Sequence, residues 1–185
     1  MLSQMVGELC VSHTYVWGGD EGPKKNPDNP VRTGWLGADL QASSSGYYSF
    51  QTIYGPTEYE RDLKSPLVRP DIDLKEGDYL IAIDGKEIKA PDNPYKYLQI
   101  ARGQKVKVTV NSKPTAISAK TYDVEPVASE NELRYNRWIA DNIQKVLQAS
   151  NGDIGYMHIT AMSSSNVAQF DKILAGVSLQ KRLDH

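Results

Sequence analysis

The sequence is poor in cysteine and histidine, and it has no long apolar run. The single cysteine, Cys10, excludes a disulfide within the chain. Three scattered histidines and one cysteine lack the spacing of a zinc site, so we expect neither a metal ion nor another cofactor. No apolar run approaches the ~20 residues that a membrane-spanning helix needs, and residues 1–10 lack the basic and apolar segments of a secretion signal. These absences leave the compartment undetermined.

Basic residues are also not in excess. The 21 lysines and arginines are outnumbered by 23 acidic residues, which gives a net charge of -2 without any basic cluster. Nucleic-acid binding leaves a basic footprint, so a nucleic acid is not an expected partner. Hydrophobic residues make up 39% of the 185-residue chain, which is enough for one or two small domains with a real core.

The first part of the chain alternates between short elements and a loop. Residues 2–8 are predicted to form a short helix. Apolar and polar residues then alternate over 9–17, which favours a strand with Tyr15 and Trp17 in the core. Residues 18–34 are dense in Gly, Pro, Asn and Asp, so this segment is predicted to be a loop or linker.

The middle of the chain is predicted to form a compact β-rich module. Asp84 and Gly85 interrupt an apolar run and are a strong signal for a two-residue hairpin turn. Asn93 followed by Pro94 is typical of a helix start, so a helix is expected over 92–101. Strands are expected over residues 34–41, 47–54, 79–88, 104–110 and 117–127.

The C-terminal third changes to helical spacing. Ser129 begins an S-x-x-E capping box, so we expect a long helix capped by Ser129 and ending at Gly152. A strand over 153–160 and a second helix over 166–176 should follow, and this order favours the opening of an α/β layer. The expected buried face of the long helix is Tyr135, Trp138, Ile139, Asn142, Ile143, Val146 and Leu147.

Several separate stretches, taken in order, resemble the core region of tricorn proteases and their bacterial homologues. These are serine peptidases related to the C-terminal processing proteases. Together the stretches cover most of residues 5–162. They read GELCVSHTYVWGGD, GWLGADLQ, SPLVRP, LKEGDYLIAIDGKEI, NPYKYL, VEPVASENELRYNRWI and GDIGYMHITAM.

The resemblance implies an α+β fold in which a PDZ domain is inserted into a catalytic subdomain. The PDZ domain would be a β-rich partial barrel of five to six strands with one or two helices, flanked by incomplete α/β elements of the protease. The implied divisions are an N-terminal catalytic piece (1–17), a linker (18–31), the PDZ domain (32–127) and the truncated start of a C-terminal catalytic subdomain (128–185).

The resemblance also assigns catalytic residues. The family uses a Ser-His-Ser-Glu tetrad, and its Ser-His pair matches Ser12 and His13, with His13 as the general base and Ser12 as an orienting residue. A serine hydroxyl needs such a base within hydrogen-bond reach. We find no stretch that matches the nucleophilic serine or the glutamate, so we expect both beyond residue 185 in a longer parent protein and no hydrolysis by this chain alone. Without the resemblance, the favoured interpretation of His13 is a strand histidine that bonds to a backbone group.

The GWLG stretch has a second implied role. In PDZ domains a glycine-containing loop points backbone N–H groups at a peptide's C-terminal carboxylate, and the peptide adds as a strand to the sheet edge. The alternative is that the glycines only turn the chain into a strand. The candidate peptide-binding residues are Gly34, Trp35, Leu36, Gly37 and Ala38, with Tyr97 and Leu98 on the helix across the groove.

The expected partners follow from these roles. They are a peptide or unfolded protein substrate and the remainder of the protease catalytic domain. A second copy of the chain is a further expectation, because half-built α/β edges can pair with one another. The alternative to a peptidase part is a stand-alone PDZ-type module that binds peptide C-termini without catalysis.

Overall fold

The structure is a computed structural model, and it divides the chain into two units, Met1–Val31 and Arg32–His185, which are described separately. It describes residues 2–9, 15, 18, 33–58, 60–99 and 103–161, and then 163, 164, 166, 167, 170, 171 and 174.

The first unit contains the helix α1, Leu2–Gly7, which confirms the short helix predicted over 2–8. Most of the strand predicted over 9–17 lies outside the described residues, and so does Trp17. Tyr15 is described, and 62% of its surface is exposed. The interpretation of Tyr15 as a core residue is therefore wrong.

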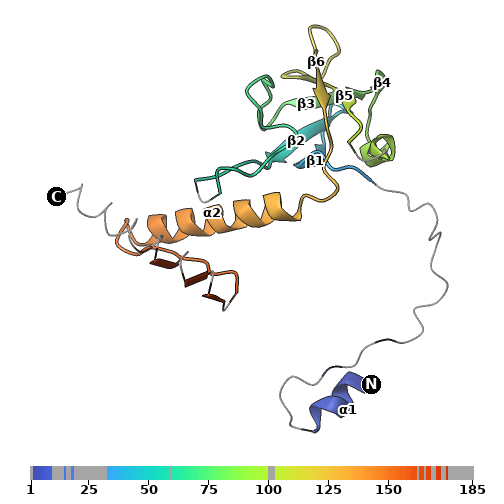
Figure 1. Cartoon of the computed structure of the whole chain (residues 1–185). Helices are drawn as coiled ribbons and strands as arrows, with labels where there is room; N and C mark the ends of the chain where they lie inside the picture. Colours follow the sequence, from blue (N-terminus) through green and yellow to red (C-terminus); the bar gives the residue numbers. More distant parts are fainter. Residues whose placement is uncertain are drawn as a thin grey trace. The chain divides into compact units, whose positions relative to one another are not determined.

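The second unit is built on one antiparallel sheet of six strands (Figure 1). The strand order is β1-β2-β3-β5-β6, and the two-residue β4 pairs with β3. Each of the five predicted strand segments of the module overlaps at least one of these strands, and β1 and β5 each extend one residue beyond the predicted end. Their bounds are β1 Ala38–Ala42, β2 Tyr48–Ile53, β3 Tyr79–Ile83, β4 Lys86–Glu87, β5 Val106–Asn111 and β6 Lys120–Val124.

The hairpin between β3 and β4 forms at the predicted turn. Asp84 and Gly85 have φ angles of 49° and 75°. Two successive left-handed residues match the twist of the flanking strands, and Gly and Asp tolerate that conformation best. The pairing of Ile83 with Lys86 closes the turn.

The core lies on one face of the sheet. The valines of β5 alternate with less buried residues, and Val106, Val108 and Val110 are at most 2% exposed. Phe50 of β2 is fully buried, and burial of a side chain of this size stabilises the fold by about 1.5–3 kcal/mol. The other members of this core are Leu36, Ala38, Leu67, Leu80, Ile83, Ile88, Leu98 and Val124.

The helix expected over 92–101 is shorter than predicted. It is a 3₁₀ helix, η1, spanning Pro94–Leu98, and the side chain of Asn93 caps it by accepting from the backbone N–H of Tyr95. The carbonyl of Leu98 accepts from the N–H of Gly34 at 2.7 Å. Because that carbonyl is used by a distant segment, it is not available to another helical turn.

The long helix is α2, Asn131–Ala149 (Figure 1). It begins later than the capping box predicted: its N-cap is Glu130, and Ser129 Oγ instead accepts from the N–H of Asn131 at 3.2 Å. It ends as predicted, since the N–H of Gly152 bonds to the carbonyl of Leu147 at 2.8 Å.

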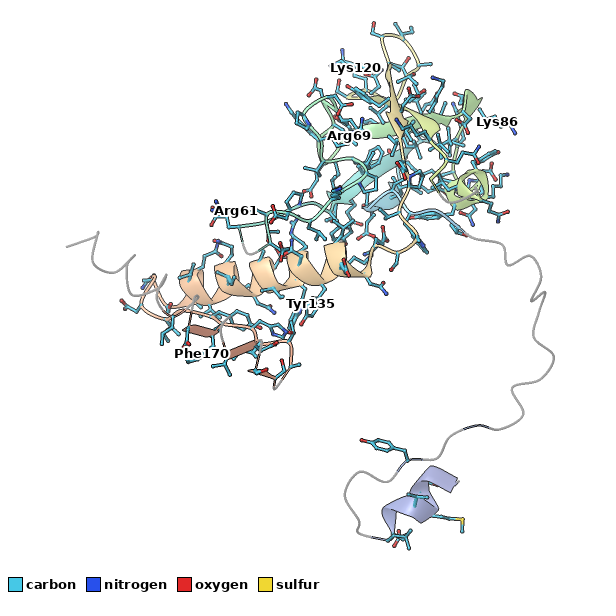
Figure 2. The ribbon with its side chains drawn as sticks, in the orientation of Figure 1. Arg61, Arg69, Lys86, Lys120, Tyr135 and Phe170 are labelled. Atoms are coloured by element: carbon cyan, nitrogen blue, oxygen red, sulfur yellow. The ribbon has the colours of Figure 1, made fainter. Side chains whose placement is uncertain are left out.

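The buried face of α2 differs from the expected one. Leu133, Asn136 and Ile139 are buried, whereas Tyr135 and Trp138 are 43% and 47% exposed. Both aromatic rings lie against His158 from the segment that follows the helix, and the Tyr135 hydroxyl forms a hydrogen bond with His158 Nε2. Tyr135 is labelled in Figure 2. The side chain of His158 is therefore half-buried and hydrogen-bonded, and it is not enclosed in an apolar core.

Residues 153–160 are not a strand, which contradicts the prediction. The segment has a strand-like pattern, but no described strand forms a β-ladder with it. A strand without a neighbouring strand leaves its backbone N–H and C=O groups without ladder partners. Within 166–176, the described residues Asn166, Val167, Phe170, Asp171 and Leu174 are helical, as expected. Among the described residues, no helix is long and apolar enough to cross a membrane.

Candidate peptide-binding edge and charge cluster

The two predicted catalytic residues, Ser12 and His13, lie outside the described residues, so their assignment stays a prediction. The predicted peptide-binding residues are all described, and they lie at the start of β1 and on η1. The candidate site is therefore built from the loop before β1, from η1 and from the side chains that surround them.

The loop before β1 is held by the domain's own backbone. The N–H of Gly34 donates to Leu98 at 2.7 Å, and the N–H of Trp35 donates to Val127 at 2.8 Å. Val127 returns a bond to the Trp35 carbonyl at 2.9 Å. These two N–H groups are thus used inside the domain, and a peptide carboxylate would depend on the N–H groups of Leu36, Gly37 or Ala38.

The candidate residues of the loop and of η1 meet at the core. Leu36, Ala38 and Leu98 share the buried core and are at most 2% exposed. Tyr97 is half-buried and packs against the same core, while its hydroxyl donates to Asp92 at 2.9 Å and Lys96 Nζ lies 4.8 Å from its ring centroid.

An aromatic pair that includes a residue outside the candidate set joins the loop to η1. The rings of Trp35 and Tyr95 lie 5.1 Å apart between their centroids. Tyr95 directly follows the Asn93-Pro94 start of η1. The sequence therefore predicts that Tyr95 lies on a helix, but it gives no sign of the contact with Trp35. Burial, and next the negative charges of Glu130 and Asp39, raise the pKa of the Tyr95 hydroxyl. Tyr95 therefore faces a charged group of residues.

Gly37 is required by the local structure. Its φ of +73° is in the left-handed region, and a Cβ there would lie 3.0 Å from Leu133 Cδ1 and 3.2 Å from Pro66 Cδ. The groups that approach this glycine are Leu133, in the first turn of α2, and Pro66.

The charged group, here called the Arg134 cluster, consists of Arg134, Asp39, Glu130 and Tyr54. Arg134 Nη2 donates to Asp39 Oδ1 at 2.5 Å and to Glu130 Oε1 at 2.6 Å. Its Nη1 donates to the Tyr54 hydroxyl at 2.9 Å, and that hydroxyl donates to Asp39 Oδ2 at 2.6 Å. The cluster fastens the start of α2 to β1 and to the residue that follows β2.

The electrostatics of the cluster follow from these bonds. The hydrogen bond from Arg134 lowers the pKa of the Asp39 carboxyl, and the pKa of Arg134 is raised mainly by that same bond. Burial, with the bond to Asp39, raises the pKa of Tyr54 to about 12. Glu130 is only 5% exposed, and its Oε2 accepts from none of the described residues. The carboxyl groups of Asp39 and Glu130 thus share one guanidinium.

The sequence contains no signal that could have revealed this cluster. Asp39 and Arg134 are 95 positions apart, and Arg134 looks like an ordinary helix surface residue with Glu130 one turn before it. Glu130 reaches the guanidinium as a neighbour one helical turn away, and the packing of α2 against Gly37 adds Asp39.

The fold and the loop define a class of protein. A sheet whose edge strand follows a Gly-x-x-Gly loop, with a short helix bonded back to that loop, has the arrangement of a PDZ domain. The sequence pattern described as the tricorn protease PDZ domain matches residues 34–129. The chain belongs to this family.

Relatives extend the similarity beyond this domain. Tricorn protease homolog 1 of Streptomyces coelicolor is 30% identical over 174 residues, covering 94% of this chain and 16% of the relative. The tricorn protease of Thermoplasma volcanium is 29% identical over 170 residues, covering 92% and 16%. A crystal structure of the tricorn protease matches with a TM-score of 0.69 at 26% identity, over 89% of this chain and 15% of that one. The chain thus spans about a sixth of the length of these relatives.

Proposed function

We propose that the chain is the part of a tricorn-type serine peptidase that supplies the general base His13, and that the nucleophilic serine belongs to the remainder of the protein. The observation that carries this proposal is the extent of the match. Tricorn proteases align over 94% of the chain, whereas the PDZ family pattern alone covers residues 34–129. The similarity therefore includes segments on both sides of the PDZ domain.

The proposed chemistry is that of an activated serine. A histidine with an ordinary pKa of about 6.5 is neutral at physiological pH and can accept the proton of a serine hydroxyl. His13 takes this role, and Ser12 orients the system. Residues 1–17 and 128–185 belong to the catalytic subdomain, on either side of the linker 18–31 and the PDZ domain 32–127.

Exposed apolar side chains after the PDZ domain support a partner for this region. Trp138, Ile154, Val167, Phe170 and Leu174 are each 39% to 60% exposed (Phe170 is labelled in Figure 2). Exposed apolar groups gathered on one segment are typical of interaction surfaces. The remainder of the catalytic domain is the proposed occupant.

A fluorophosphonate probe, which labels activated serines, tests the proposal. The 185-residue chain should take no adduct in intact-mass spectrometry, and the same chain extended by the remainder of the protease should take one. A His13-dependent adduct on the 185-residue chain would overturn the proposal, because it would show a nucleophile within this sequence. An unlabelled extended protein would also contradict it.

A second function is proposed for the PDZ domain: binding an extended peptide at the outer edge of β1. The supporting observation is that β1 is the first strand of the sheet order and pairs on one side with β2. An edge strand offers unpaired backbone groups to an added strand. The loop residues Leu36, Gly37 and Ala38 are the proposed carboxylate site.

Peptide titrations test this second function. Labelled peptides with a free C-terminus should bind more tightly than the same peptides with an amidated C-terminus, as measured by fluorescence anisotropy. The reason is that backbone N–H groups at the loop would hold only the charged terminus. Equal affinities would exclude carboxylate recognition and leave the β1 edge as the binding element.

A further inference from the structure

We propose that Asp39 makes the β1 edge selective for a basic side chain, lysine or arginine, at an outward-facing position of the bound peptide. The inference rests on the proposed binding of peptides at β1. It adds the chemical class of the ligand, which neither the loop nor the edge strand defines by itself.

The first step is the direction in which Asp39 faces. Ala38 is 2% exposed and Leu40 packs against the core, so these two residues of β1 face inward. Side chains alternate along a strand, so Asp39 faces the opposite side, where α2 lies against the loop. A peptide strand added beside β1 also alternates, and every second side chain of it projects onto the face that carries Asp39.

The second step is the charge of that face. Nε and both terminal nitrogens of Arg134 already donate to Asp39, Glu130 and Tyr54. With two carboxylates around one guanidinium, the cluster carries a net charge of about -1. One of these carboxylates, Glu130, is 5% exposed, and its Oε2 is an acceptor that none of the described residues fills. The cluster would therefore need one more positive charge to be neutral.

The third step is access. The side chains of Asp39 and Arg134 are 36% and 38% exposed, so a side chain from a neighbouring strand can reach the carboxylate of Asp39. A lysine or arginine there would bring the net charge of the group to zero. A glutamate would meet two carboxylates that already share their only cation. Opposite charges on adjacent strands stabilise the strand pairing by roughly 0.2–1 kcal/mol, and like charges destabilise it by a similar amount.

A charge scan of the ligand tests the proposal. Labelled hexapeptides of alanine and valine are prepared with lysine or glutamate at each of the last four positions in turn, and their affinities for the 185-residue chain are measured by anisotropy at low salt. At every second position of the peptide, the peptide with lysine should bind about 2- to 30-fold more tightly than the peptide with glutamate. At the positions between them the two peptides should differ by less than about twofold.

Two variants make the result specific. In Asp39→Asn the preference for lysine should fall below about twofold, while the affinity of the uncharged peptide changes little. Asp123→Asn is the matched control, because Asp123 is an exposed aspartate on β6 that pairs with Lys107, and it should keep the full preference. The alternation with period two is a readout that general attraction of cations to an acidic protein does not produce.

The outcomes separate this inference from the proposal on which it rests. Peptides that bind equally well regardless of charge would overturn the role of Asp39 and leave peptide binding at β1 intact. A lysine preference that survives in Asp39→Asn, or that lacks alternation, would also overturn it. If no peptide of the series binds, the proposed peptide-binding function fails, and this inference fails with it.

Discussion

Replacing His13 with alanine in the protein extended by the remainder of the protease is expected to lower kcat/KM for peptide hydrolysis by about 10³- to 10⁶-fold. Without a base, the serine hydroxyl is a poor nucleophile, and what remains of catalysis comes from oxyanion stabilisation and substrate binding. KM should change little, because the base acts in the chemical step. Initial rates on a fluorogenic peptide library measure both constants.

The matched control is another histidine of the same chain. His158 lies against Tyr135 and Trp138 on α2 and has no proposed part in the chemistry. His158→Ala should keep kcat within about threefold of the parent, provided that circular dichroism shows both variants folded. An extended His13→Ala protein that cleaves peptides at the parental rate would refute the assignment of His13 as the base.

The elements that the sequence predicted well depend on local chemistry. Asp84 and Gly85 define their turn through backbone preferences that act within the hairpin itself. Val106, Val108 and Val110 alternate so regularly that β5 and its buried face follow from the pattern alone. Such signals need no knowledge of what lies on the other side of the core.

The predictions that were wrong failed because of contacts between segments that are distant in the sequence. The helix after Asn93 ends at Leu98 because Gly34, far away in the sequence, takes the Leu98 carbonyl. Residues 153–160 have a strand-like pattern, yet a strand forms only where a partner strand is available. The expected face of α2 was wrong at Tyr135 and Trp138 because these rings pack on the following segment rather than on the sheet.

In the candidate site, too, local features were predictable and contacts between distant segments were not. A strand opened by glycines was predictable from the GWLGADLQ stretch, and β1 spans Ala38–Ala42 within and just beyond it. Which N–H groups remain for a ligand was not predictable, since Gly34 and Trp35 are used by Leu98 and Val127. The Arg134 cluster was not predictable at all, because its partners come from β1, the segment after β2 and the start of α2.

Replacing Arg134 with methionine is expected to lower the free energy of unfolding by about 2–3 kcal/mol. The change leaves Glu130, 5% exposed, without a donor among the described residues, and an uncompensated buried carboxylate is costly. The expected loss is smaller than the roughly 3–5 kcal/mol typical of fully buried pairs, because Arg134 and Asp39 are more than one-third exposed. Urea unfolding curves measure the difference.

The control is on the same helix. Arg137 has the same side-chain exposure of 38% and pairs with Asp141 at 2.8 Å, but its partners are on the surface, so Arg137→Met should cost no more than about 1 kcal/mol. Adding Glu130→Gln to Arg134→Met should recover part of the loss, since an amide tolerates burial better than a charge. Equal losses for Arg134→Met and Arg137→Met would contradict a special role for the cluster.

The pH dependence of unfolding gives the cluster an independent signature. Arg134 lowers the pKa of Asp39 in the folded chain below its ordinary value of 3.8. The unfolded chain therefore binds a proton at Asp39 before the folded chain does, and the stabilisation is present above pH 3.8 and lost as the pH falls through the folded pKa. Asp39 should consequently contribute more to acid destabilisation of the parent chain than of Arg134→Met, where the largest cause of the shift is gone and the bond from Tyr54 is left. Because Asp39 is the proposed selector of basic ligands, this comparison also tells whether its carboxylate is held ionised by Arg134 where a peptide would meet it.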